Sequence, residues 1–183
     1  MNDPQDLQRH RDGWTHRGAE RPDFAIEPGP GQESVWDYPR PPAYQPDDRT
    51  VSVTVDGQRI AWSRHSIRVM ETGSPPAFYL PPEAVDGRYL RPSSQRSFCE
   101  WKGEAEYFDV VTDSGVIEAA FWRYPEPLAG ARAIAGWYSL YPEKLQCQVG
   151  DDPVQPQAGR YYGGWVTPEL VGPWKGEPGT GHW

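Results

Sequence analysis

Carboxylates and one lysine alternate in the segment EWKGEAE, which spans residues 100–106. In an extended chain, alternate side chains share one face, so this face would carry three carboxylates and one ammonium. If this face is shielded from solvent, the three carboxylates repel one another and share a single ammonium. At least one of their pKa values is then raised, and a carboxyl group with a raised pKa suits acid–base catalysis. A solvated charged face is the other interpretation, and the sequence favours it. The residues concerned are Glu100, Lys102, Glu104 and Glu106.

Glu71 is a second acid–base candidate, because it ends an apolar run that begins at Ile67. A carboxylate beside buried apolar residues needs a partner, which Arg68, Arg91 or Lys102 can supply. Glu71 would then act as acid or base, with Lys102 as electrostatic stabiliser, in a cofactor-free elimination, isomerisation or hydrolysis. A structural ion pair explains the same residues without catalysis.

Aromatic side chains are frequent, at 13% of 183 residues, with 9 Trp, 10 Tyr and 5 Phe. Their rings form flat walls for sugars, nucleobases or cationic ligands, with N–H and O–H groups at the rims. We therefore predict a cleft walled by Trp101, Trp122 and Tyr124, in which Glu71 and Lys102 fix polar groups. An all-β core packed with rings is the alternative.

Cys99 is a candidate nucleophile only with a base beside it, and His65 is the one plausible base in the body of the chain. A buried, inert thiol is the simpler interpretation. Cys99 and Cys147 lie too far apart in sequence to form a closed zinc site by themselves. Phosphate-binding glycine motifs are also missing from the sequence. We therefore predict neither a metal nor a cofactor.

The formal net charge of −8 argues against binding to a nucleic-acid backbone, which depends on Lys and Arg. No apolar stretch reaches the roughly 18 residues that a membrane span requires. The polar start of the chain lacks an apolar signal region, and only two cysteines are present. These features predict a cytoplasmic protein with reduced thiols.

Gly and Pro, at 19 and 21 residues, interrupt nearly every window long enough for a helix. This excludes a helical bundle and a doubly wound α/β fold. We predict a small, mainly β domain with antiparallel sheets, at most one or two short helices, and extended irregular termini. Strands are expected over 51–55, 59–63, 77–80, 98–112, 116–124, 136–140 and 144–149, and a helix only over 128–135.

The two longest expected strands, 98–112 and 116–124, form one hairpin. A two-residue loop at Ser114-Gly115 would place Phe108 opposite Phe121, and their neighbours would also be favourable cross-strand partners. These neighbouring pairs are Tyr107 with Trp122 and Glu106 with Arg123.

The ends of the chain differ from its middle in composition. Residues 1–31 are polar and aperiodic, which predicts a flexible tail. Residues 32–183 form a single β domain, in which 154–183 is an irregular wrap rich in Gly and aromatic residues. The tetrapeptide Trp-Lys-Gly-Glu occurs at 101–104 and again at 174–177, but no common period supports a repeat.

Five blocks follow one another in order: ESVWDYPRPP, RVMETGSPPAFYLPPEAV, CEWKGEAEYF, AAFWRYPEPL and YYGGWVTPELVGPWKGEPGTGHW. With these blocks, about residues 30–183 resemble the bacterial DUF427 proteins in their longer form with extended termini. The resemblance implies a small antiparallel β domain of the β-tent kind. By motif, it also implies a site drawn from Glu71, Tyr79, Cys99, Trp101, Lys102, Trp122 and Tyr124.

The DUF427 proteins also carry a nucleotidyltransferase label, which this sequence does not favour. Its adjacent aspartates, Asp47-Asp48 and Asp151-Asp152, lack the Asp-x-Asp spacing of the metal ligands in such enzymes. Other β-tent proteins use four zinc cysteines or a tryptophan cage. The two cysteines here argue against zinc, whereas the supply of Trp allows a cage.

Three functions follow from the sequence. The first is binding of a small organic ligand in the aromatic cleft, and the second is a cofactor-free acid–base enzyme in the same cleft. The third is a protein-interaction module that uses the Pro-aromatic termini. The expected partner is a small molecule rather than nucleic acid or membrane, and a homodimer stays open.

Overall fold

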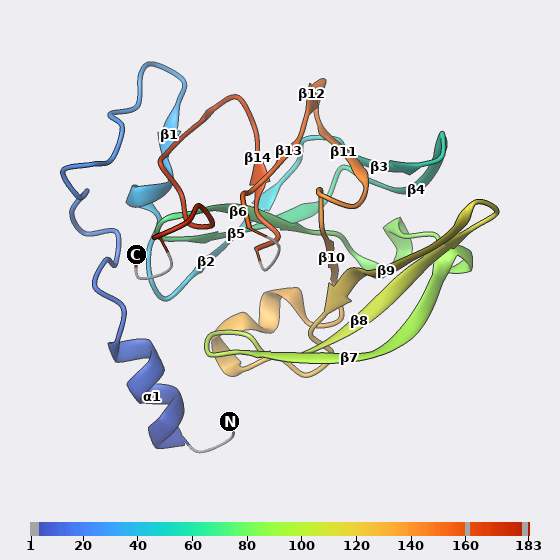
Figure 1. Ribbon diagram of the computed structural model, residues 1–183, viewed down its shortest axis with the longest axis horizontal. Coiled ribbons are helices and arrows are strands. Elements are labelled where there is room, and N and C mark those ends of the chain that lie inside the picture. Colours follow the sequence, from blue (N-terminus) through green and yellow to red (C-terminus); the bar gives the residue numbers. More distant parts are fainter. Residues whose placement is uncertain (1–3, 160–161, 181–182) are drawn as a thin grey trace.

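The computed structural model describes residues 4–159, 162–180 and 183. The described part is mainly β, as predicted, and its strands form several small sheets (Figure 1). One α-helix, α1 (Pro4–Asp12), lies within these residues. Four short 3-10 helices complete the helical content: η1 (Val35–Asp37), η2 (Pro82–Ala84), η3 (Gly87–Tyr89) and η4 (Ala129–Ile134).

The three longest strands and the short strand β10 form a four-stranded antiparallel sheet of order β10-β9-β8-β7. It lies on one side of the molecule, and its β8–β9 hairpin extends away from the body (Figure 1). The strands are β7 (Leu90–Cys99), β8 (Gly103–Thr112), β9 (Gly115–Arg123) and β10 (Tyr138–Leu140).

The predicted pairing of Phe108 with Phe121 is confirmed, together with both neighbouring pairs. The predicted loop is wrong by one residue, because Thr112 pairs with Gly115 and residues 113 and 114 form the turn. A bulge after Phe108 reconciles the two registers. Ala119 adopts a φ of +46° within this bulge. Its N–H donates to Oδ1 of Asp109 over 2.9 Å, so a side chain holds the irregular backbone.

Two smaller antiparallel sheets cover the other side of the molecule. The strands expected over 51–55 and 59–63 are present and pair as a hairpin around Asp56-Gly57. The order in one sheet is β2 (Ala43–Asp47), β5 (Ser66–Glu71) and β6 (Ser74–Tyr79), and in the other β12 (Asp152–Pro153), β11 (Gln146–Val149), β3 (Val51–Val55) and β4 (Gln58–Ser63).

The C-terminal segment packs against these sheets through buried side chains, and its short strands form two separate pairs. Trp165 is fully buried, and its ring lies 5.1 Å from that of Phe78 in the largest apolar cluster. The pairs are β13 (Gln155–Pro156) with β14 (Trp165–Val166), antiparallel, and β1 (Glu33–Ser34) with β15 (Leu170–Val171), parallel.

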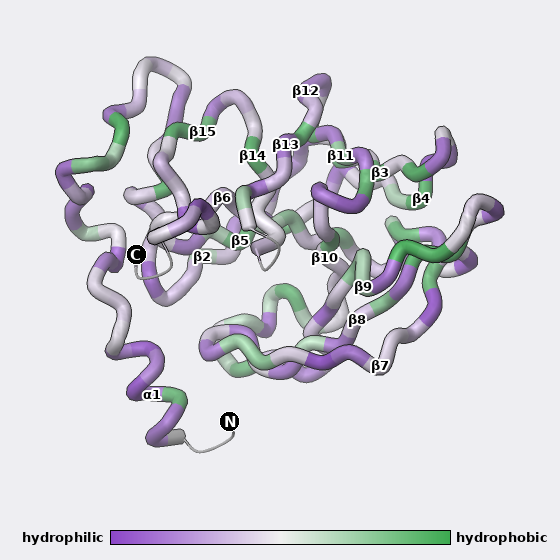
Figure 2. The backbone as a smooth tube through the Cα atoms, viewed as in Figure 1, coloured by the Kyte–Doolittle hydropathy of each residue, from purple (hydrophilic) through white to green (hydrophobic). Residues whose placement is uncertain are grey.

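The N-terminal residues contact the body at several points. Phe24 stacks on Trp183 with a centroid distance of 4.6 Å, and Phe24 also packs edge-on against Trp36. The helix α1 is largely hydrophilic (Figure 2) and was not predicted. The predicted helix over 128–135 is present only as the 3-10 helix η4. Flexibility of residues 1–31 stays a prediction, and residues 1–3 lie outside the described range.

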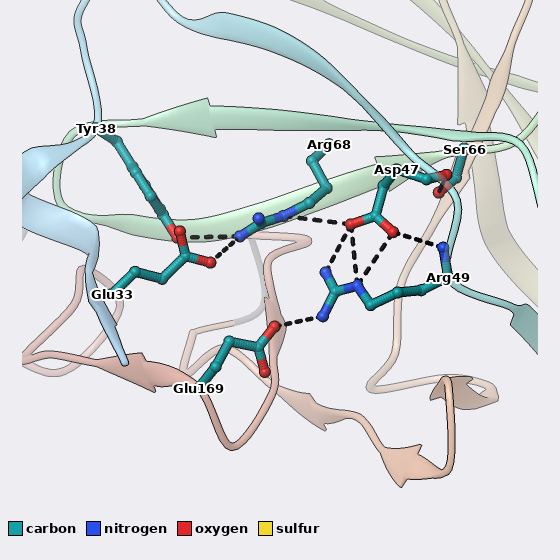
Figure 3. A network of polar contacts seen from close by, with 7 residues as sticks. All are labelled: Glu33, Tyr38, Asp47, Arg49, Ser66, Arg68 and Glu169. Carbon is teal, nitrogen blue, oxygen red and sulfur yellow. Dashed lines mark hydrogen bonds and ion pairs between the residues drawn. The ribbon is translucent and has the colours of Figure 1, made fainter. Parts of the chain in front are cut away.

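A polar network ties β1, β2 and β5 to the C-terminal segment (Figure 3). Arg68 donates to Glu33 and to the Tyr38 hydroxyl. Arg49 donates to Asp47 over 2.7 Å and to Glu169 over 2.6 Å. These contacts use Arg68 for structure and leave it unavailable to Glu71.

Candidate functional site

A cavity of about 250 Å³ is lined by residues of two sheets, β2-β5-β6 and β10-β9-β8-β7. Trp14 from the N-terminal segment, and Lys175 with residues 157 and 162–164 from the C-terminal segment, complete its wall. Segments far apart in sequence therefore build one site. Six of the seven predicted site residues line it: Glu71, Tyr79, Cys99, Lys102, Trp122 and Tyr124.

The aromatic side chains of the cavity wall are buried and contact one another. Trp122 donates from Nε1 to the hydroxyl of Tyr79 over 3.0 Å, and the two rings meet edge-to-face. The ring of Tyr124 lies 6.5 Å from that of Tyr79, and both side chains are buried. Burial raises the pKa of both phenols, so they remain neutral O–H groups at neutral pH.

A glycine lets the C-terminal segment approach Trp122 closely. A Cβ atom built on Gly163 would lie 2.3 Å from the Trp122 ring, which is well inside contact distance. The backbone of residue 163 therefore forms part of the wall because it carries no side chain.

Lys102 lies in the turn between β7 and β8, where Cys99 pairs with Gly103. The extended face expected over residues 100–106 is therefore wrong at this end, because the turn sends Lys102 into the cavity while Glu104 is exposed. Within the described part of the chain, Lys102 Nζ forms no hydrogen bond and no ion pair. Burial acts to lower the pKa of Lys102, but the nearby Cys99 and Glu71 outweigh it, so the pKa is raised.

Glu71 has a different partner from the three that the sequence offered. Its Oε1 accepts a hydrogen bond from Arg40 Nε over 3.1 Å. The Arg40 side chain is fully buried and also donates to the carbonyl oxygens of Thr72 and His16. Of the offered partners, Arg91 pairs with Asp109 instead. Glu71 is therefore held in place on the cavity wall with its charge compensated.

Lys175 was not singled out from the sequence, yet it lines the same cavity with only 2% of its surface exposed. Its Nζ lies 3.4 Å from the centre of the Trp14 ring. Burial, reinforced by Arg40, lowers the pKa of Lys175 to about 7, although Glu71 and Glu100 oppose the shift. The cavity thus contains two lysines whose pKa values move in opposite directions. Opposite pKa shifts in two neighbouring groups of the same type allow one lysine to act as a cation and the other as a neutral amine.

Trp14 and Glu100 connect the N-terminal segment to the cavity wall. Trp14 Nε1 donates to Glu100 Oε1 over 2.9 Å, and Arg11 donates to the Glu100 carbonyl oxygen. The guanidinium of Arg40 lies 4.1 Å from the Trp14 ring centre. Trp14 is therefore held between cations and a carboxylate at the boundary of the cavity.

Cys99 is half-buried on the cavity wall, where its thiol donates to Glu100 Oε2 over 3.7 Å. His65, the base considered for it, is exposed and does not line the cavity. The Cys99–His65 arrangement is therefore not formed.

Trp101 is the predicted wall residue that lies elsewhere. It contributes to a smaller pocket of about 160 Å³ together with Arg11 and Tyr44. Its Nε1 is buried and has no hydrogen-bond partner among the described residues.

In the described ranges, no three His, Cys, Asp or Glu side chains are grouped so that they could hold a metal ion, and His182 lies outside those ranges. No helix there is long and apolar enough to cross a membrane.

The sequence matches the family model for a domain of unknown function, DUF427, over residues 43–151. The chain belongs to the DUF427 family. The DUF427 segment includes Glu71, Cys99 and Lys102, whereas Trp14, Arg40 and Lys175 lie outside it. The cavity of this DUF427 protein is therefore completed by its terminal segments. A comparison with curated proteins gives no match.

Proposed function

We propose that the cavity binds a small organic anion with a flat ring. The observation that carries the proposal is the ammonium of Lys102, which faces the cavity without a hydrogen-bond or ion-pair partner in the described part of the chain. Removing a charged group from water without a partner costs several kcal/mol of free energy. A hydrogen bond between this group and a ligand offsets part of that cost. A ligand carboxylate supplies the missing partner, and the rings of Trp122 and Tyr124 supply apolar walls.

Glu71 favours the ammonium of Lys102 by its charge but forms no ion pair with it among the described residues, because the carboxylates of the cavity have donors of their own. Glu71 accepts from Arg40, and Glu100 accepts from Trp14. Because these acids have their own donors, the charge that awaits a partner is positive. This favours an anionic ligand over the cationic ligands that aromatic walls alone would suit.

Calorimetric titration at pH 7 with 4-methylbenzoate and with its neutral amide, 4-methylbenzamide, tests the proposal. The acid should bind roughly tenfold or more tightly than the amide, because a hydrogen bond to a charged group contributes about 1.5–3 kcal/mol. Lys102→Met should remove this preference. Lys144→Met is the matched control, because Lys144 donates to the carbonyl oxygens of Glu118 and Ala119 outside the cavity. Equal affinities for acid and amide would contradict the proposal.

A second candidate is the cofactor-free acid–base enzyme. It is supported by Glu71 and Lys102, which line one cavity as that mechanism requires. A metabolite screen by thermal shift, followed by Glu71→Gln on each hit, separates the two functions. Lost turnover with retained binding indicates catalysis, whereas unchanged behaviour indicates binding alone.

A further inference from the structure

Two of the three lysines in the chain line the same cavity, although the chain has 18 basic residues in total. Lysine is among the residues that are least often buried. The third, Lys144, lies outside the cavity and donates to backbone carbonyl oxygens. Lys102 and Lys175 are therefore notable because they line one cavity, and their surroundings in it differ.

Lys175 is held firmly by its own backbone. Its N–H donates to the Gly73 carbonyl oxygen over 2.9 Å, and its carbonyl oxygen accepts from Gln157 Nε2 over 2.8 Å. The side chain then extends across the Trp14 ring to the cavity. In the described residues, Nζ has no hydrogen-bond acceptor. The backbone of Lys175 is thus anchored, and its amino group contacts the Trp14 ring without a hydrogen bond to any other described residue.

The charges around Lys175 come from three segments. Arg40 opposes a second positive charge nearby, whereas Glu71 and Glu100 favour it. With a pKa of about 7, a large fraction of Lys175 is the neutral amine at neutral pH, while Lys102 remains an ammonium. A lysine that is desolvated beside another cation is the usual form of an amine that attacks carbonyl compounds.

We propose that Lys175 forms an imine with the carbonyl carbon of a small keto or aldehyde acid whose carboxylate is held by Lys102. The inference rests on the proposed function and deepens it, because it names the class of ligand. Lys102, Lys175 and the carboxylate of Glu71 all line one cavity of about 250 Å³, so a small ligand can reach all three groups.

The step takes up one proton from solvent and needs no oxidant or reductant. The Lys175 nitrogen forms a C–N bond to the carbonyl carbon, and the C=O π electrons move to oxygen, which takes a proton from solvent water. Glu71 accepts the proton that nitrogen loses and returns it to the hydroxyl group, which leaves as water while the C=N bond forms. The products are one protonated imine and one water, and no oxidation or reduction occurs.

Reductive trapping tests the inference. The full chain is incubated at pH 7 with 4-carboxybenzaldehyde and sodium cyanoborohydride, and the reduced adduct is located by peptide mass spectrometry. Labelling of Lys175 should be roughly tenfold or more faster than that of Lys144, because the amine fraction rises tenfold for each unit by which the pKa falls toward the pH. Lys175→Arg should abolish the fast adduct, Lys175→Met should do the same, and Lys144→Arg should leave it unchanged.

The control ligand 4-methylbenzoate has the same ring and carboxylate but no carbonyl carbon that can form an imine. Fast labelling of Lys175 that excess 4-methylbenzoate suppresses supports the inference. Equal labelling of Lys175 and Lys144, or labelling that survives Lys175→Arg, overturns it. If 4-methylbenzoate binds in a Lys102-dependent manner while Lys175 stays unlabelled, the inference fails and the proposed function stands. If 4-methylbenzoate does not bind, the proposed function fails on its own measurement.

Discussion

Arg40 donates from its guanidinium Nε to Oε1 of Glu71 over 3.1 Å, from a side chain that is fully buried. The same guanidinium donates to the Thr72 carbonyl oxygen over 2.8 Å. Arg40 therefore fixes the end of β5 and compensates the carboxylate on the cavity wall. Glu71 therefore has its donor in Arg40 rather than in Lys102, and Lys175 has a cation beside it.

Arg40→Met should lower the free energy of unfolding by about 3 kcal/mol, because removal of one partner leaves a partly buried charge uncompensated. The substitution should also raise the pKa of Lys175, because the positive charge of Arg40, which lowers this pKa together with burial, would be gone. Urea unfolding measures the first effect, and the pH dependence of Lys175 acetylation measures the second.

Arg88→Met is the matched control for this substitution. Arg88 pairs with Asp86 on the surface with 85% of its side chain exposed, so its loss should change stability by less than about 1 kcal/mol. Equal losses of stability in the two variants would show that the Arg40–Glu71 pair has no special weight.

The strand pattern could be predicted because alternation is a local signal. Phe108 and Phe121 face each other as their spacing around the hairpin indicates. The exact loop could not be predicted, because the bulge depends on a side chain, Asp109, that caps the Ala119 N–H. A local pattern of apolar residues carries no information on such a cap.

The lining of the cavity was predictable where its residues lie on the strands and turns of the DUF427 segment. Glu71, Lys102 and Trp122 meet in one cavity, although Trp101 does not. Lys175 and Trp14 were missed because they lie near opposite ends of the sequence, and only tertiary contacts bring them into the cavity wall. A signal did exist: lysine is rare in this sequence, and Lys102 and Lys175 occupy the same position in the two Trp-Lys-Gly-Glu segments.

Lys175→Met should stabilise the protein most at acidic pH, and the gain should shrink as the pH rises above 7. The pKa of Lys175 is lowered to about 7 in the folded state from its ordinary 10.5, so the unfolded state binds more protons between these values. The stability of the wild type therefore rises across this window, by up to about 1.4 kcal/mol per pH unit. Urea unfolding of both proteins at pH 6, 8 and 9 measures the narrowing gap.

The difference between the free energies of unfolding of the wild type and of Lys175→Met at each pH gives the contribution of Lys175 alone, because other groups that titrate in this range affect both proteins equally. Lys144→Met, at a lysine outside the cavity, is measured in parallel. A gap for Lys175→Met that stays constant from pH 6 to pH 9 would show that the Lys175 amine is an ordinary ammonium throughout.

Trp14→Ala should open the cavity and expose Cys99. Trp14 donates to one oxygen of Glu100, and the Cys99 thiol donates to the other. Loss of the indole therefore removes part of the wall of the cavity that Cys99 also lines, and alkylation of Cys99 by iodoacetamide should become several-fold faster. Cys147, which is buried, is the internal reference in the mass spectrum. Trp62→Ala, at a 45% exposed tryptophan, should leave the rate unchanged.

Gly163→Ala should displace Trp122 and weaken binding of 4-methylbenzoate. The new methyl group would lie 2.3 Å from the Trp122 ring, and the hydrogen bond to Tyr79 prevents the indole from moving freely. Such overpacking costs about 1–3 kcal/mol in stability. Thermal unfolding and calorimetric titration measure the two effects.

The double variant Gly163→Ala with Trp122→Phe distinguishes a steric cause from a general loss of structure. Phenylalanine is smaller than tryptophan and leaves room for the methyl group, so the two substitutions should couple favourably and cost less together than the sum of their separate effects. Gly87→Ala is the control, because no atom lies within 4 Å of a Cβ at that position. Strict additivity of the two changes would mean that Gly163 does not act through Trp122.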